Sequence, residues 1–119
     1  MSRRKKEILK FLQHPRPEDF DLPTVLHACA DLTRLKLLLD LRQSPGKTCG
    51  TFETDVSKST LSGHFKVLRE AGLIRQESGP GNSRLNWLRI SELETRFPGV
   101  IPSILDAFKQ DFQNPAPVS

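Results

Sequence analysis

The sequence predicts a mainly α-helical domain with one small β-hairpin, an α+β fold. Apolar residues recur at helical spacing along most of the chain, whereas the stretch around the turn "SGPGNS" alternates as paired strands do. The 119 residues are enough for one hydrophobic core but not for two. We therefore expect a single domain, 1–119, divided into segments at 1–21, 22–90, 91–112 and 113–119.

The segment 1–21 is expected to form a short helix and a connection. Its apolar positions at helical spacing follow the basic start "MSRRKK" and are Ile8, Leu9, Phe11 and Leu12. The helix should stop before "HPRPEDFDLP", because proline lacks an amide donor. The apolar positions are too interrupted for a signal peptide, and no apolar run approaches the roughly 20 residues of a membrane span. We expect a cytoplasmic protein with no membrane partner.

Asp31 divides the apolar stretch "TVLHACADLTRLKLLLDLRQ" into two helices, because Asp is a favoured N-cap. The first helix should end near Ala30. The second should place Arg34 and Lys36 outside. Its residues expected to face the core are Leu32, Leu35, Leu38 and Leu39. A turn is expected at "QSPGKTCG", and "TFETDV" forms a short helix at best.

The next helix begins at Ser57 or Lys58 and stops at Gly72. Its buried face is predicted by an i, i+4, i+7 spacing at Leu61, Phe65 and Leu68. The opposite face carries Ser59, Ser62, Gly63, Lys66, Arg69 and Glu70.

A β-hairpin follows this helix. In its returning strand Leu85 and Trp87 alternate with Arg84 and Asn86, which predicts a packed face and a polar face. A short helix, a turn, an exposed helix and a hairpin in this order predict a winged helix-turn-helix.

The segment 91–112 is expected to be helical but interrupted by Pro98 and Pro102. Its apolar stripe consists of Val100, Ile101, Ile104, Leu105, Phe108 and Phe112. This stripe is larger than a small monomer can bury, so we expect a homodimer held by the terminal helices. Residues 113–119 should form a frayed tail.

The net charge of +4 favours a polyanionic partner. An α-helix fits the major groove of B-DNA and a wing reaches the adjacent phosphates, so we expect double-stranded DNA. The basic side chains expected on one surface are Lys58, Lys66, Arg69, Arg75 and Arg84. The alternative is a winged helix that docks a protein, which would show an exposed apolar patch at that surface.

Two stretches, "HACADLTRLKLLLDL" and "SKSTLSGHFKVLREAGLI", resemble the arsenical-repressor (ArsR-type) winged-helix regulators over about 22–90. The resemblance implies a homodimeric transcription regulator, in most cases a repressor released by a metal, an oxidant or another inducer. By position, it places Ser57, Ser59, Thr60, Ser62, His64 and Lys66 on the recognition helix, with Arg75 and Arg84 flanking the wing tip. The sequence departs from the family at Leu32, where proline is usual, and at Gly63, where a larger residue is usual.

With the outward-facing residues added, the candidate DNA-binding set is Ser57, Lys58, Ser59, Thr60, Ser62, Gly63, His64, Lys66, Arg69, Arg75 and Arg84. Metal sensors of the family use a Cys pair before the recognition helix, or His and Asp on the last helix. Here the matching segment holds only Cys49, and the last helix has no His or Cys. We therefore expect no metal and no cofactor.

Cys29 and Cys49 form either a redox pair or two inert thiols. An enzyme is not expected, since the chain shows no nucleophile with a His and acid arrangement and no phosphate-binding glycine loop. The inducing signal and the operator stay open.

Overall fold

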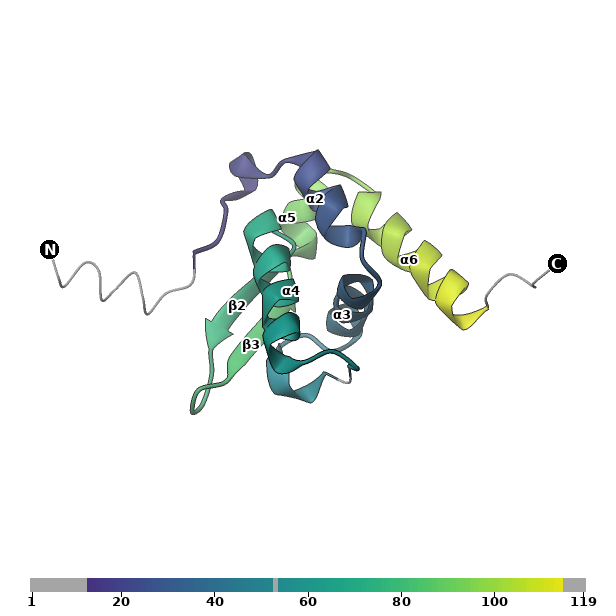
Figure 1. Ribbon diagram of the computed structural model, residues 1–119. Helices are drawn as coiled ribbons and strands as arrows, with labels where there is room; N and C mark the ends of the chain where they lie inside the picture. Colours follow the sequence, from purple (N-terminus) through teal and green to yellow (C-terminus); the bar gives the residue numbers. More distant parts are fainter. Residues whose placement is uncertain (1–12, 53, 115–119) are drawn as a thin grey trace, which may run out of the picture.

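The computed structural model describes residues 13–52 and 54–114, which form five α-helices and a three-stranded antiparallel sheet (Figure 1). The elements are η1 (Pro17–Asp19), α2 (Leu22–Cys29), α3 (Leu32–Gln43), β1 (Lys47–Thr48), η2 (Cys49–Thr51), α4 (Lys58–Ala71), β2 (Ile74–Ser78), β3 (Arg84–Leu88), α5 (Ile90–Arg96) and α6 (Val100–Gln113). The predicted α+β winged helix-turn-helix is confirmed. The helix predicted at Ile8, Leu9, Phe11 and Leu12 and the tail from 115 onward lie outside the described residues.

The division between α2 and α3 falls where the sequence predicts it. The Asp31 carboxylate caps α3 by accepting a hydrogen bond of 3.0 Å from the Arg34 backbone N–H. The predicted core face of α3 is partly wrong, because Leu32 is 57% exposed while Leu37 and Leu41 are buried beside Leu38. Leucines fill five of the seven positions from 35 to 41, so the pattern does not fix which side faces inward.

Helix α4 packs its predicted apolar face into the core. Leu61, Phe65 and Leu68 are buried, and the Phe65 ring lies edge-on to Phe52, with 5.3 Å between ring centroids. The helix ends at Gly72, whose φ of +90° is left-handed. A Cβ at this position would lie 2.4 Å from the Phe20 ring, so both the conformation and the space require glycine.

The sheet has one strand more than the predicted hairpin, in the order β1-β3-β2. Strand β1 lies inside the predicted turn "QSPGKTCG" and pairs Lys47 with Asn86. Two residues are too few to show an alternating pattern in the sequence.

The predicted orientation of β3 is inverted. Asn86 is fully buried and faces the helices with Gln76 of β2, whereas Leu85 and Trp87 lie half-buried on the other face. The buried amides are satisfied by each other, because Gln76 Nε2 donates to Asn86 Oδ1 over 2.8 Å.

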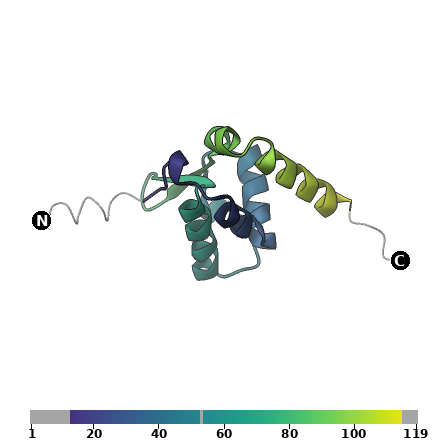
Figure 2. The same cartoon turned by 90° about the horizontal axis from the view of Figure 1, so that it is seen from above.

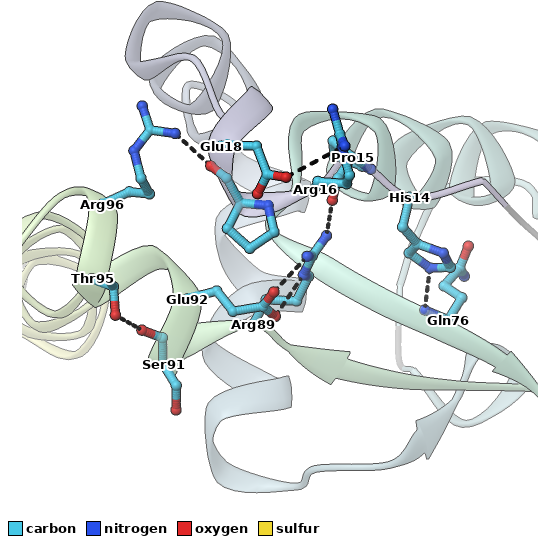
Figure 3. Close-up of polar contacts among 11 residues, drawn as sticks. His14, Pro15, Arg16, Glu18, Gln76, Arg89, Ser91, Glu92, Thr95 and Arg96 are labelled. Atoms are coloured by element: carbon cyan, nitrogen blue, oxygen red, sulfur yellow. Dashed lines mark hydrogen bonds and ion pairs between the residues drawn. The ribbon is translucent and has the colours of Figure 1, made fainter.

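The connection before α2 is held against β2 and α5 (Figure 3). The Gln76 backbone N–H donates to His14 Nε2 over 3.0 Å, on the edge strand β2. The Arg89 guanidinium donates to the Pro15 carbonyl over 2.8 Å and is held by Glu92. The bond to His14 occupies an amide of the sheet edge, and the bond from Arg89 ties the connection to the start of α5.

The C-terminal segment divides once, at Pro98 and Gly99 between α5 and α6. The second predicted interruption is wrong: Pro102 lies in the first turn of α6, where an amide has no intrahelical partner to lose. Helix α6 packs on α3 and α5 and extends away from the other helices (Figures 1 and 2). Ile101 and Leu105 are buried, whereas Phe112 is 54% exposed.

Candidate nucleic-acid interface

The N-terminus of α4 carries a cluster of hydroxyls. Ser57 is the N-cap: its Oγ accepts from the Thr60 backbone N–H over 3.2 Å and lies 3.2 Å from Ser59 Oγ. Lys58, Ser59 and Thr60 are exposed. Free amides and the positive end of the helix dipole make such an N-terminus suited to a phosphate group.

The outward face of α4 follows with Ser62, Gly63 and Lys66, all exposed. Ser62 and Lys66 are one helical turn apart, on the side opposite the buried stripe. A Cβ added at Gly63 would meet no atom within 4 Å, so this stretch of the face is open. Lys66 pairs loosely with Glu70 at 4.0 Å, which leaves its ammonium group available to a stronger anion.

His64 lies at the flank of this face and is half-buried. Its Nδ1 is 3.2 Å from Arg34 Nη1 and 3.8 Å from Asp31 Oδ2. Arg34 was predicted to point outward, but its guanidinium turns toward His64. The sequence shows Arg34 only as the third residue after a cap, and nothing in that pattern reveals a partner 30 residues away.

Arg69 does not share the exposed face predicted for it. Its Nη1 donates to Gln76 Oε1 over 2.7 Å, so the guanidinium faces the sheet behind α4. Burial, together with the nearby charge of Arg84, lowers the pKa of Arg69 from its ordinary value. Helical spacing predicts Arg69 on the polar face, but its long side chain reaches the buried amide of Gln76 instead.

The two wing arginines lie on opposite faces of the hairpin. Arg84 lies opposite Ser78 in the pairing of β3 with β2. Ser78 is three residues after Arg75, and successive residues of a strand point to alternate faces, so Arg75 and Arg84 point to opposite faces. Arg75 stacks on Trp87, 4.8 Å from the ring centroid, and pairs with Glu77 at 3.1 Å. The expectation that five basic side chains share one surface is therefore wrong.

Polar and basic side chains from the helix and the wing do line a common cleft. Lys58 and Ser62 of α4 and Arg84 of β3 line one open cleft of about 670 Å³. Phe52 and Leu61 also line it, as do Cys49 and Gly50 of η2. The lining of this cleft thus comes from α4, from η2 and from the wing.

The two cysteines are free and differ in environment. Cys29 is buried in α2, and this burial raises the pKa of its thiol to about 11. Cys49 is half-buried in η2, where its sulfur accepts from Asn86 Nδ2 over 3.3 Å and from Gln76 Nε2 over 3.7 Å. The low thiolate fraction of Cys29 disfavours it as one half of a redox pair.

Within residues 13–52 and 54–114, no three His, Cys, Asp or Glu side chains gather as metal ligands would. Nor does any helix in this part of the chain combine the length and the apolar character that a membrane crossing requires.

The fold is that of a winged helix-turn-helix protein, in which α4 occupies the position of the recognition helix. Residues 31–76 match the family model described as bacterial regulatory protein, arsR family. The fold is similar to the crystal structure of an ArsR family transcriptional regulator. That match has a TM-score of 0.57 and 20% sequence identity, and covers 87% of this chain and 100% of the other. No curated protein matches the chain.

The resemblance seen in the sequence is thus confirmed for residues 31–76, which are similar to the arsR-family model. The match spans the capping Asp31, the recognition helix and the start of β2. Both comparisons are with transcription regulators: the family model describes a bacterial regulatory protein, and the similar structure is that of a transcriptional regulator.

Proposed function

We propose that the protein is a transcription regulator that binds a palindromic operator in duplex DNA as a homodimer and acts as a repressor. The observation that supports DNA as the partner is the convergence of Lys58, Ser62 and Arg84 on one cleft. The chain supplies the fixed positive charge that phosphates attract, from a helix and a wing at once.

The alternative, a protein-docking surface, calls for an exposed apolar patch at α4 and the wing. Among the described residues, the large apolar side chains that are clearly exposed are Leu22, Leu26, Leu32 and Phe112. All four lie on α2, α3 and α6. Their placement favours DNA at the recognition helix.

The helix and the wing have separate roles in this proposal. Ser62 and Lys66 are exposed one turn apart and enter the major groove, where their side chains contact base edges. Arg84 is exposed near the hairpin tip and contacts a phosphate. Arg75 is occupied by Glu77 and Trp87 and is expected to contribute less.

The roles are tested with Ser62→Ala, Lys66→Ala and Arg84→Ala on an operator and on random duplex DNA. Losing a base contact costs about 1–3 kcal/mol and relaxes the preference at one position. Losing a phosphate contact weakens binding to all DNA sequences alike. It also lowers the slope of log affinity against log salt concentration by about 1. We expect Ser62→Ala and Lys66→Ala to reduce the difference in affinity between operator and random DNA. Arg84→Ala should lower both affinities and leave their difference unchanged.

Binding isotherms at several salt concentrations make this measurement, and Arg75→Ala is the matched control from the other face of the wing. We expect Arg75→Ala to change affinity and salt slope less than Arg84→Ala does. If Arg84→Ala removed the preference for the operator while the helix variants kept it, the wing would be the reader and the roles would be reversed.

The homodimer rests on helix α6. Phe108 and Phe112 stack with 5.5 Å between ring centroids, and Phe112 is 54% exposed on a helix that extends away from the core. Ile104 beside them is only partly buried. A two-fold axis would use this patch twice and present two copies of α4 to the two halves of a palindrome.

We expect the protein to sediment as a dimer at micromolar concentration and Phe112→Asp to shift it toward monomer. An exposed side chain contributes little to the monomer fold, so circular dichroism should be unchanged. The control is Leu26→Asp, a leucine 43% exposed on α2, which packs on α3 and α4. A wild-type monomer at this concentration would contradict the proposed dimer.

A further inference from the structure

The Arg34 side chain of α3 contacts both α2 and the helix α4. Its Nε donates to the Ala28 carbonyl over 2.6 Å, and its Nη2 donates to the His27 carbonyl over 3.3 Å. Its Nη1 lies 3.2 Å from His64 Nδ1 on α4. One guanidinium thus contacts the end of α2 and the imidazole of the recognition helix.

The contact determines which ring nitrogen of His64 accepts. Arginine has five N–H donors and no acceptor, so Nδ1 must offer its lone pair to Nη1. The competing group is the Asp31 carboxylate, which would favour a proton on Nδ1. Its oxygen is 3.8 Å away, beyond hydrogen-bond range, whereas 3.2 Å to Arg34 lies within it. In the neutral ring the proton is therefore on Nε2.

The Nε2 atom is accessible. It has no hydrogen-bond partner among the described residues, and the one buried side-chain nitrogen or oxygen without a partner in that part of the chain is Arg69 Nε. Nε2 must then reach solvent. The His64 side chain is only 16% exposed, so the ring is held close to the protein surface and does not extend as Lys66 does.

We propose that Arg34 is a positioning residue that holds His64 as an Nε2–H donor to a phosphate oxygen of the DNA backbone. This inference rests on the proposed function and adds a residue that itself stays behind the interface. A phosphate is favoured over a base edge because the ring is fixed at the flank of α4 and has little reach into the groove. An N–H donor that is already oriented toward the phosphate adds affinity, because it need not be ordered on binding.

Arg34 also has a structural role, since it satisfies two carbonyls at the end of α2. The test must therefore separate positioning from stability. Arg34→Met keeps the aliphatic stem and removes every donor. His64→Gln supplies an amide that can turn a donor outward without help from Arg34. The double variant completes a cycle.

The first readout is the tautomer of His64 in the full-length protein without DNA, from ¹⁵N chemical shifts of the ring. We expect a protonated Nε2 and an acceptor Nδ1 in the wild type, and a mixture or an inverted tautomer in Arg34→Met. A wild-type ring protonated on Nδ1, or a tautomer unchanged in Arg34→Met, would overturn the proposal.

The second readout is affinity for duplex DNA, measured on operator and random sequences. We expect Arg34→Met to weaken both by on the order of tenfold, the size of one hydrogen bond to a charged acceptor. In the His64→Gln background the same change should cost less than about threefold, while the loss in thermal midpoint stays the same.

An equal loss of affinity in both backgrounds would overturn the positioning role, because Arg34 would then act through direct contact or general stability. A loss confined to the operator would overturn the assignment to phosphate. If the wild type bound no duplex DNA, the proposed function would fail, and the tautomer measurement alone would decide whether Arg34 positions His64.

Discussion

Cys29 and Cys49 show how much a residue's surroundings change its chemistry. Both are free thiols in one small domain. Burial raises the pKa of the Cys29 thiol to about 11, so at pH 8 only about one molecule in a thousand carries the reactive thiolate. Cys49 is half-buried, beside the cleft that joins helix and wing. If oxidation regulates this protein, Cys49 is the better-placed thiol.

We expect iodoacetamide to modify Cys49 before Cys29 in the folded protein at pH 8. The rate at Cys29 should rise as the pH approaches 11, because the neutral thiol that burial favours is lost only there. Peptide mass spectrometry over a time course measures both sites, and the unfolded protein, in which the two should react alike, is the control. Faster modification of Cys29 at pH 8 would contradict its burial.

At this scale the sequence predicts local roles well. Asp31 caps α3 and Gly72 ends α4, as predicted, because each role depends on residues within one turn. The start of α4 was predicted at Ser57 or Lys58, and Ser57 is its N-cap. The positions of Arg34 and Arg69 were not predictable. Their side chains are long, and their partners, His64 and Gln76, belong to other elements.

Among the elements, the wing differs most from its sequence pattern. The alternation in β3 predicts correctly that Arg84 and Asn86 share one face and Leu85 and Trp87 the other. The pattern does not say which face is inside. The polar face is inside because Asn86 can satisfy its amide there, on Lys47, Gln76 and Cys49.

Replacing Asn86 by Ala should therefore destabilise the domain. The change removes the donor to the Lys47 carbonyl and the oxygen acceptor of Gln76 Nε2, which keeps only its 3.7 Å contact with Cys49 Sγ. We expect this to cost about 2–4 kcal/mol in the free energy of unfolding. Urea unfolding measures the difference. Asn82→Ala, an exposed asparagine near the hairpin tip, is the control and should change stability by less than about 0.5 kcal/mol. Equal effects would contradict the buried network.

For the whole molecule, the order of elements in the sequence is enough to predict a winged helix-turn-helix. The third strand, the inward polar face and the placement of Arg75 away from Arg84 emerge only when the elements pack. The stripe on α6 is only partly absorbed by the core, since Ile101 and Leu105 are buried and Phe112 is not. The exposed part of this stripe is the surface on which the proposed dimer rests.

The central claim is that α4 and the wing of two protomers read duplex DNA. Selection of bound fragments by the full-length protein from a random duplex pool tests it most directly. We expect enrichment of one sequence with two inverted half-sites, their centres about one helical turn of 10–10.5 base pairs apart or a multiple of it. A protein that retained no fragment above background, or that enriched no sequence over the input pool, would contradict the claim.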